Sequence, residues 1–404
     1  MEESQRVWKF VLIDENGEEH HFFGGKVAFK GVGVPASRAT RGFLVVDSQG
    51  NRRYLKDTWR ILSDTIQKEG DVYALLKEHN VPHVPDVIVS GNAIGDWQRT
   101  KTHEYVTPTF QDAVLRNHQH YFIVFAQVGT PLKDFKNSFE LVQATSHAIE
   151  AHKVAYEKAK ILHRDISVGN ILIMDGGQGL LIDWEFSKPL DSSAPRTLER
   201  TGTWQFMSAR LLSHKPGEVN HILADDLESF YHVLCWVTLM HGRHELSKED
   251  AENQIARVYD GWNGVKASDV KGGSDKIVDL QKKWMAKQAK LVEGPLRDLV
   301  VGLEALLVVR YIEPSEFVNQ DVVNAKLKKL DDSTWFLDSF SQALQHEEQL
   351  KSQERDPIRA ISLPAMGDDD PNNRKRKKTD SELQEEDEDE DEERPSRRPR
   401  TSES

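Results

Sequence analysis

The chain has 404 residues, of which 38% are apolar, and its net charge is −13. This length predicts about two lobes or domains with tails, and the composition can supply a sizeable core. The charge argues against a basic protein that binds nucleic acid directly, and no apolar run approaches the roughly 18 residues of a membrane span. The N-terminus lacks a basic start followed by an apolar stretch, and the single cysteine, Cys235, excludes a disulfide or zinc framework within one chain. We therefore expect no membrane association and a reducing compartment.

Residues 1–135 are predicted to form a small lobe rich in strands. Short apolar or aromatic segments alternate there with turn residues, at 7–13, 20–23, 43–46, 86–89 and 121–125. The stretch GVGVPA contains Gly31 and Gly33, and glycines at such positions let backbone amides approach phosphate groups. A plain turn explains these two glycines about as well.

Lys56 ends a short strand, about 25 residues after these glycines, and a predicted helix at 64–79 follows it. A lone lysine on a strand is usually a solvated edge charge, but its place between a glycine loop and a helix favours phosphate binding. Glu69 is the predicted carboxylate partner of Lys56, and Asp71 is the alternative. Gly70 weakens this helix by up to about 1 kcal/mol.

The sequence from Ser138 has helical periodicity and leads into the stretch LHRDISVGNILIMDGGQGLLIDWEF. Two apolar runs flank the turn DGGQG, which predicts a β-hairpin. Asp165 and Asn170 precede the first strand and Asp183 follows the second, so the three side chains should meet at one rim. Because Mg²⁺ prefers oxygen ligands, Asn170 and Asp183 could hold it and leave Asp165 for a substrate hydroxyl. An acidic surface hairpin is the alternative.

These motifs, HRDISVGN and DWE, resemble the HRDxxxxN and DFG motifs of protein kinases. With RTGTWQFMSARLL and DDLESFYHVL, the chain most resembles the fungal-type protein kinase family, over about residues 20–345. The DDLES string is similar to that of the casein-kinase group.

The resemblance implies an α+β, two-lobed protein-kinase-like fold, with a β-rich N-terminal lobe at 1–135 and a helical C-terminal lobe at 136–350. It implies that Asp165 is catalytic and that Asp226 supports the HRD turn from behind. Magnesium would bind at Asn170 and Asp183. The residues implied to bind ATP are Lys56, Glu69, Gly31 and Gly33, with the backbone at 126–128 facing the adenine.

Three positions depart from the family pattern. Glu185 replaces the glycine of DFG, which could restrict movement of this segment. Ser167 stands where most serine/threonine kinases have a lysine, so activity could be low unless another cation substitutes. Arg210 replaces the glutamate of APE, so the usual buried ion pair cannot form in the same way. Thr197, Thr201 and Thr203 are possible phosphorylation sites.

Residues 351–404 are nearly free of apolar side chains and are predicted to be a disordered tail. The tail carries 15 acidic and 9 basic residues from Asp368 onward, which places −6 of the net charge there and −7 in the body. The basic run from Arg374 to Lys378 has the composition of a nuclear-import signal, and Arg394 to Arg400 is a possible second element. This predicts an import receptor as partner and a nuclear location; a solvated charge run is the alternative.

We therefore expect a serine/threonine protein kinase that uses ATP and Mg²⁺ and acts on protein substrates. The alternatives are a pseudokinase scaffold that recruits partners through its charged tail, and a small-molecule kinase of the aminoglycoside or choline type.

Overall fold

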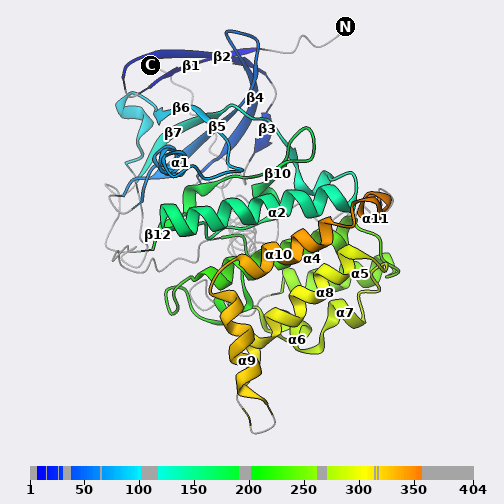
Figure 1. Ribbon diagram of the computed structural model, residues 1–404. Coiled ribbons are helices and arrows are strands. Elements are labelled where there is room, and N and C mark those ends of the chain that lie inside the picture. Colours follow the sequence, from blue (N-terminus) through cyan, green and yellow to red (C-terminus); the bar gives the residue numbers. More distant parts are fainter. Residues whose placement is uncertain are drawn as a thin grey trace, which may run out of the picture.

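The computed structural model describes residues 7–14, 16–25, 27–30, 38–63, 66–101, 117–190, 202–261, 271–313, 315 and 318–356. A twisted sheet with one helix forms an upper lobe, and a bundle of helices forms the lower lobe (Figure 1). The predicted α+β fold, with a β-rich N-terminal lobe and a helical C-terminal lobe, is confirmed.

The upper lobe contains a seven-stranded antiparallel sheet in the order β1-β2-β4-β5-β7-β6, in which β3 also pairs with β4. Its strands are β1 (Trp8–Ile13), β2 (Glu19–Gly24), β3 (Val27–Lys30), β4 (Arg41–Asp47), β5 (Arg52–Ile61), β6 (Val87–Asn92) and β7 (His118–Phe125). Phe22, Phe43, Leu55 and Val124 belong to the small core on one face of this sheet. β3 was not predicted, and neither was the length of β5, because the charged residues of β5 hide the alternation of a strand.

The helix α1 (Glu69–Glu78) covers the other face of the sheet and buries Val72 and Leu76. It begins later than the predicted helix at 64–79, since Lys68 is extended at its N-cap. Gly70 is required at its position: a Cβ there would lie 2.2 Å from Ser90 Oγ, and the Gly70 amide donates to the Tyr121 hydroxyl at 3.0 Å. Close packing against the sheet thus explains the glycine that weakens the helix.

The lower lobe is built around α2 and α4, with α10 beside α2 (Figure 1). Its helices are α2 (Ser138–Val154), α3 (Ala209–Ser213), α4 (Leu223–His241), α5 (Lys248–Tyr259), α6 (Ser274–Lys282), α7 (Trp284–Lys287), α8 (Pro295–Leu307), α9 (Gln320–Leu327), α10 (Thr334–Leu344) and α11 (Glu347–Ser352). All 19 residues of α4 are buried, so this helix is the centre of the lobe. Cys235 is buried within it, and burial raises the pKa of its thiol well above the usual range.

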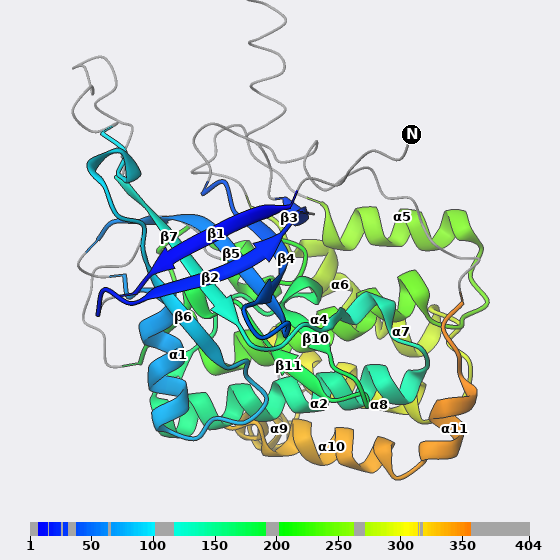
Figure 2. The same ribbon diagram turned by 90° about the horizontal axis from the view of Figure 1, so that it is seen from above.

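Short elements connect the two lobes and the helices. A three-stranded sheet contains β8 (Thr130–Pro131), β10 (Ile171–Ile173) and β11 (Gly179–Leu181), and β9 (Ile161–Leu162) pairs with β12 (Lys188–Pro189). Single turns of helix are η1 (Asp96–Gln98), η4 (Leu132–Asp134), η5 (Ala155–Ala159), η6 (Val168–Asn170), η7 (Trp184–Phe186), η9 (Val308–Tyr311) and η10 (Lys328–Leu330). Seen from above, the upper sheet lies over the β10–β11 hairpin, while α5 and α7 extend beyond the sheet (Figure 2).

The predicted start of the tail at residue 351 is wrong, because the folded lobe continues to Asp356. Lys351 and Ser352 belong to α11. The Arg355 amide then donates to Lys136 O at 3.0 Å, and the Asp356 amide donates to His241 O at 3.0 Å. These bonds dock the segment against the start of α2 and the end of α4. The remaining predicted tail, with the run from Arg374 to Lys378, lies outside the described residues.

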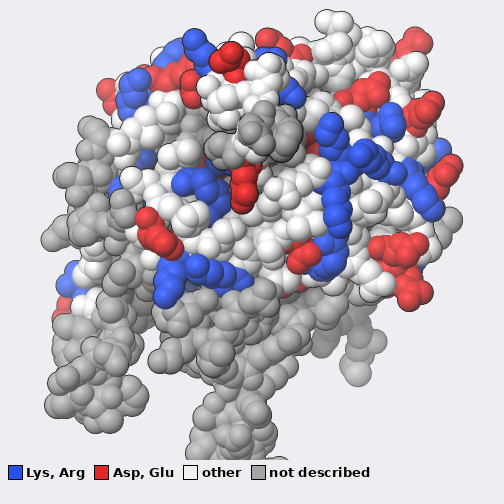
Figure 3. Space-filling model, turned by 90° about the horizontal axis from the view of Figure 1, so that it is seen from below, with Lys and Arg blue, Asp and Glu red and all other residues white. Residues whose placement is uncertain are grey.

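The lower face of the molecule carries both signs of charge. Figure 3 shows a band of Lys and Arg side chains there, beside separate groups of Asp and Glu. In the described part of the chain, no helix combines the length and the apolar character needed to cross a membrane.

Candidate active site

The predicted hairpin is present and is formed by β10 and β11. Ile171 pairs with Leu181 and Ile173 with Gly179, which closes the turn between them. The Ile182 amide donates to Asn170 O at 2.9 Å, so the bonding continues one step beyond the strands. Asn170 and Asp183 therefore emerge at the same end of the hairpin, as predicted.

Lys56 lies among three carboxylates that come from both lobes. Its Nζ atom donates to Glu69 Oε2 at 2.8 Å, to Asp183 Oδ1 at 3.0 Å and to Glu185 Oε2 at 3.4 Å. Lys56 belongs to β5 and Glu69 to the first turn of α1, whereas Asp183 and Glu185 follow the hairpin. The structure thus pairs Lys56 with Glu69, the first of its two predicted partners, and one buried ammonium group connects the lobes.

Burial and the neighbouring charges act in opposite directions on the pKa values of these groups. Although burial favours the neutral amine, the carboxylates raise the pKa of Lys56 well above its usual range. Burial also opposes ionisation of Asp183, but Lys56 and Arg38 hold its pKa below the ordinary value. For Glu69, burial outweighs the attraction of Lys56 and raises the pKa. Oxygens of Glu69, Asp183 and Glu185 lie close enough together to hold a metal ion, but the Lys56 ammonium already serves as their cation.

Arg38 adds a second cation that the sequence did not reveal. Its Nη1 atom lies 2.5 Å from Glu185 Oε2, and its guanidinium lies 4.4 Å from the centre of the Phe186 ring. Arg38 precedes β4, so this contact is a further bond between the lobes. Glu185 needs no glycine-like backbone, because the left-handed residue of the DWE motif is Asp183. Glu185 instead lies in the helical turn η7.

Two residues of the site have left-handed backbones, which are uncommon outside glycine. Arg164 has φ +70° and Asp183 has φ +64°. The Arg164 amide donates to Asp226 Oδ2 at 3.1 Å, and the Asp183 amide donates to the Tyr73 hydroxyl at 3.1 Å. A buried side chain therefore anchors each strained turn.

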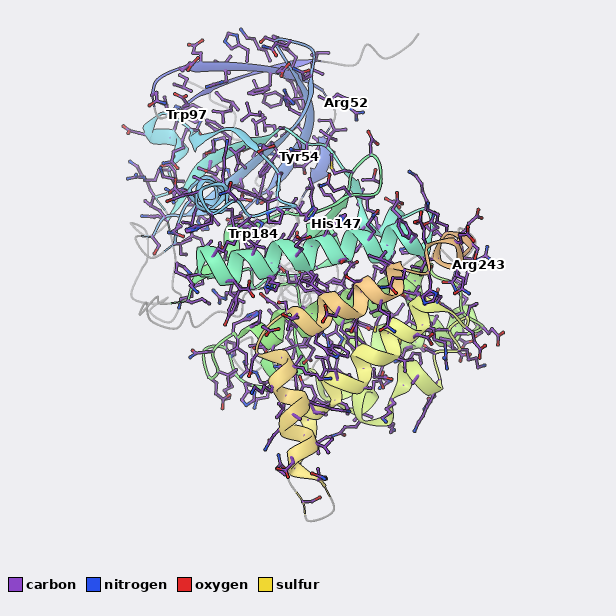
Figure 4. All side chains as sticks on the ribbon, in the orientation of Figure 1. Arg52, Tyr54, Trp97, His147, Trp184 and Arg243 are labelled. Carbon is purple, nitrogen blue, oxygen red and sulfur yellow. The ribbon has the colours of Figure 1, made fainter. Side chains whose placement is uncertain are left out.

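His163 connects the two turns through a neutral ring. Its Nε2 atom bonds Ile182 O at 3.1 Å, and its Nδ1 atom accepts from the Asp165 amide at 3.2 Å. These two bonds require the tautomer protonated at Nε2. Burial lowers the pKa of His163 to about 4, so the ring is neutral at physiological pH. The ring packs edge-on against Trp184, at 4.6 Å between centroids, and Figure 4 shows Trp184 near the upper side of α2, with Tyr54 on the sheet above.

Asp165 is buried, and its carboxylate is held by Thr203. Its Oδ1 atom accepts from the Thr203 amide at 2.8 Å and from the Thr203 hydroxyl at 2.7 Å. Burial and the negative charge of Asp183 raise the pKa of Asp165. Among the described residues, no Lys or Arg pairs with this carboxylate. Ser167, which stands where most serine/threonine kinases have a lysine, is buried two residues after Asp165. Thr203, a predicted phosphorylation site, thus uses its hydroxyl inside the site; Thr197 and Thr201 lie outside the described residues.

Two side-chain oxygen atoms, one of Asn170 and one of Asp183, could serve as ligands of Mg²⁺. The Asn170 side-chain amide donates to Asp165 O at 2.8 Å, which leaves Asn170 Oδ1 as a ligand atom. Lys56 bonds Oδ1 of Asp183 and leaves its Oδ2. A carboxylate and an amide oxygen, with water and phosphate oxygens, form the hard ligand set that Mg²⁺ prefers.

Asp226 supports the HRD turn from α4, as predicted. Besides the Arg164 amide, it contacts His152 Nε2 at 2.8 Å and His221 Nε2 at 2.7 Å. Although burial opposes ionisation, His221 and His152 hold the pKa of Asp226 well below its usual range. The turn is thus fixed to the central helix of the lobe.

Arg210 enters an ionic network, and the acidic groups of that network come from α4. It pairs with Asp225, which also lies 2.6 Å from Arg310 Nη2 and accepts from the Ser208 hydroxyl at 2.8 Å. Arg310 pairs in addition with Glu228, and Glu228 Oε1 accepts from the Ala209 amide at 2.7 Å. Glu228 thus supplies the carboxylate that the substitution at Arg210 removes.

Some predicted contacts lie elsewhere or outside the described residues. Gly31 and Gly33 are outside them. In the connection at 126–128, the Ala126 amide donates to Asp86 O at 2.9 Å and its carbonyl accepts from Arg53 at 3.2 Å. Ala126 is therefore occupied, and an adenine edge would have to use the backbone that follows.

Comparison with known proteins gives a match over part of the chain. Residues 91–238 match the family model described as fungal protein kinase, and the predicted resemblance is confirmed there. This segment includes Asp165, Asn170 and Asp183, whereas Lys56 and Glu69 precede it. The search of curated proteins returned no match. A solved structure titled "ROP18 kinase domain in complex with AMP-PNP and sucrose" is 12% identical, with a TM-score of 0.44 over 85% of this chain and 87% of that chain.

Proposed function

We propose that this chain, whose residues 91–238 match the fungal protein kinase family, is an active protein kinase that transfers the γ-phosphoryl group of ATP to Ser or Thr hydroxyls. One observation carries the proposal. Lys56, Glu69 and Asp183 meet within hydrogen-bonding distance, although they come from two lobes, and Asp165 precedes the hairpin that leads to Asp183. We assign nucleotide binding to the first three residues and contact with the acceptor to Asp165.

In this account each residue has one task. Lys56 binds phosphate oxygens, and Glu69 holds its ammonium in place. Asn170 and Asp183 hold Mg²⁺, which neutralises phosphate charge when it is bound. Asp165 accepts a hydrogen bond from the acceptor hydroxyl and aligns it. Gly31 and Gly33 cover the phosphates.

A protein acceptor is favoured over a small molecule by the segment that follows Gly202. This segment is bonded to Asp165 through Thr203 and is packed on α4 through Ser208 and Ala209. It therefore lies beside Asp165, and we assign the binding of an extended peptide to it.

The pseudokinase scaffold remains a second candidate because of two observations. Asp165 lacks a cationic partner among the described residues, and Lys56 is bonded to Glu185 besides Glu69 and Asp183. Both features could weaken the transfer step without preventing nucleotide binding.

Labelling of peptides tests the proposal. The full chain is incubated with radiolabelled MgATP and a degenerate library of Ser, Thr and Tyr peptides, beside an Asp165→Asn control. We expect label on phosphoserine and phosphothreonine that the control lacks. Absence of label despite a thermal shift with MgATP would favour the scaffold, and label on phosphotyrosine alone would contradict the acceptor class. Label that appears only with aminoglycosides or choline would favour the small-molecule kinase.

We also propose that the run from Arg374 to Lys378 binds a nuclear-import receptor and places the protein in the nucleus. Five consecutive basic residues suit an acidic receptor groove. A fluorescent fusion of the full chain should lose nuclear enrichment when this run is changed to alanine. A second variant with alanine at Arg397, Arg398 and Arg400 measures the share of the possible second basic element. Unchanged enrichment in the first variant would refute the assignment.

A further inference from the structure

Lys276 is a buried lysine of the C-terminal lobe that contacts the segment after Gly202. It lies in α6, and 1% of its surface is exposed. Its Nζ atom donates to Gln205 O at 2.7 Å and to Met207 O at 2.7 Å, and it lies 5.6 Å from the centre of the Tyr259 ring. Among the described residues, no carboxylate forms an ion pair with it.

A buried ammonium without a carboxylate partner costs free energy, because it has lost its hydration shell. Two charge-assisted bonds to carbonyls and an aromatic face offset part of this cost. Burial lowers the pKa of Lys276 to about 7, which shows how far its surroundings disfavour the charge. A methionine would fill a similar volume without this cost. The presence of a lysine therefore points to a role for its hydrogen bonds to the two carbonyls.

It holds a turn that also carries Thr203. The amides of Phe206 and Met207 donate to Thr203 O at 3.0 Å and 3.2 Å, so residues 203–207 form one bonded unit. Lys276 bonds the far side of this unit, and the Thr203 amide and hydroxyl bond Asp165 on the near side. A continuous chain of short bonds therefore connects α6 to the catalytic carboxylate.

The helix that carries Lys276 is itself fitted closely to this segment. A Cβ on Gly272 would lie 2.5 Å from Trp204 Cζ2, and a Cβ on Gly273 would lie 2.8 Å from Ala209 O. The Gly272 amide donates to Leu212 O at 3.0 Å. The start of α6 is therefore packed directly against residues 204–212.

We propose that Lys276 is a positioning residue that holds residues 203–207 so that Thr203 orients Asp165 toward the acceptor hydroxyl. This inference rests on the proposed kinase function and extends it to a residue outside the cleft. Its effect falls on the transfer to a peptide acceptor and not on nucleotide binding, because neither Lys56 nor Asp183 touches this chain of bonds.

The test compares Lys276→Met with Tyr259→Phe in the full chain. Lys276→Met removes the two hydrogen bonds that Nζ donates to the turn. Tyr259→Phe keeps the aromatic ring beside Lys276 and removes only its hydroxyl. A displaced acceptor group can cost about 10²-fold in rate. For Lys276→Met we expect a loss of about this size in kcat for peptide phosphorylation, with MgATP affinity within about twofold of the wild type. Tyr259→Phe should keep both values, and Lys276→Gln, a neutral donor, should recover part of the peptide kcat.

Hydrogen exchange of the Phe206 and Met207 amides gives a second readout that does not need activity. These amides should exchange faster in Lys276→Met, while those of the β10–β11 hairpin stay protected. A peptide kcat within about threefold of the wild type together with unchanged exchange would overturn the proposal. Parallel loss of MgATP binding and cooperative unfolding would also overturn it, since it would mark a general structural role. A wild type that transfers no phosphoryl group would refute the kinase function instead, and the exchange result would still decide whether Lys276 holds the turn.

Discussion

The two functional carboxylates of the cleft lie in different electrostatic surroundings. Asp183 shares Lys56 with two other acids and has a lowered pKa, whereas Asp165 is bonded to neutral Thr203 and has a raised pKa. A metal ligand should be ionised, and a group that accepts a proton benefits from a higher pKa. The difference therefore fits the two tasks assigned to these residues.

Replacement of Asp183 tests the metal assignment. Asp183→Ala removes a ligand oxygen while Glu69 and Glu185 remain to pair Lys56, so the fold should persist. We expect Mg²⁺-dependent turnover to fall by at least about 10²-fold, the usual size for loss of one electrostatic group in a site. Asp175→Ala, in the exposed turn of the same hairpin, is the control. Turnover retained at the wild-type level in Asp183→Ala would exclude it as a metal ligand.

His163 predicts a specific pH dependence of stability. Its pKa is about 4 in the folded chain and about 6.5 when unfolded. Between these values only the unfolded chain binds the proton, so the unfolding free energy falls as pH is lowered from 6.5 to 4. The contribution from this group is about 3 kcal/mol.

Urea unfolding at several pH values measures this contribution. His163→Gln cannot take up the proton, so its deficit relative to the wild type should shrink as the pH falls toward 4. A His163→Gln deficit that is constant over this interval would contradict the neutral buried ring.

Sequence reasoning identified the residues whose partners are near in the chain or belong to a motif. Asp165, Asn170 and Asp183 lie on one hairpin, so a local pattern was enough to bring them together. Arg38 and Lys276 were missed, because nothing local marks an arginine that contacts Glu185 or a lysine that contacts the carbonyl of Gln205. Such contacts depend on tertiary packing between elements far apart in the sequence.

At the scale of elements, the hairpin is fixed to α2 by a close approach at Gly179. A Cβ there would lie 2.2 Å from Ala144 O, which is backbone and cannot move aside. Gly179→Ala should therefore destabilise the fold by about 1–3 kcal/mol. Gly302 lies within α8 with no atom within 4 Å of an added Cβ, so Gly302→Ala should stabilise by about 0.5–1 kcal/mol. Denaturant midpoints measure both, and a midpoint for Gly179→Ala at or above the wild type would contradict this packing.

Arg310 is expected to matter more for stability than an exposed arginine with as many partners. It pairs with buried Asp225 and Glu228, and removal of one partner of a buried ion pair costs about 3–5 kcal/mol. Arg310→Met should lower the unfolding free energy by this amount. Arg257 pairs with Asp275 and Asp279 at the surface, so Arg257→Met should cost less than about 1 kcal/mol. Equal losses measured by urea unfolding would contradict the role of the buried network.

Most strands and the long helices followed from periodicity, and the boundaries did not. The start of α1 was placed too early, because Ile66 continues the apolar pattern of the helix, whereas the backbone of Lys68 is extended. The folded lobe was ended too early at Leu350, because Gln353 to Asp356 are polar and dock through backbone hydrogen bonds and polar side-chain contacts. Such docking leaves no signal in the apolar pattern.

At the scale of the whole molecule, the two lobes are connected through their charged groups and through a histidine pair. Lys56 forms an ion pair with Asp183, and Arg38 forms one with Glu185. Next to α1, His83 stacks on His147 of α2, with ring centroids 4.2 Å apart, and Figure 4 shows His147 on the side of α2 that faces the sheet. A nucleotide that binds between Lys56 and Asp183 would therefore change the contacts that determine the distance between the lobes.

The measurement that tests the central claim most directly is single-turnover transfer from MgATP to a peptide, with the dissociation constant of MgATP measured on the same proteins. The account assigns nucleotide binding to Lys56 and Asp183 and acceptor alignment to Asp165. Asp165→Asn should therefore bind MgATP within about twofold of the wild type and lose about 10²–10⁴-fold in transfer rate, the range for a general base. An Asp165→Asn protein that transfers at the wild-type rate, or that no longer binds MgATP, would contradict this division of tasks.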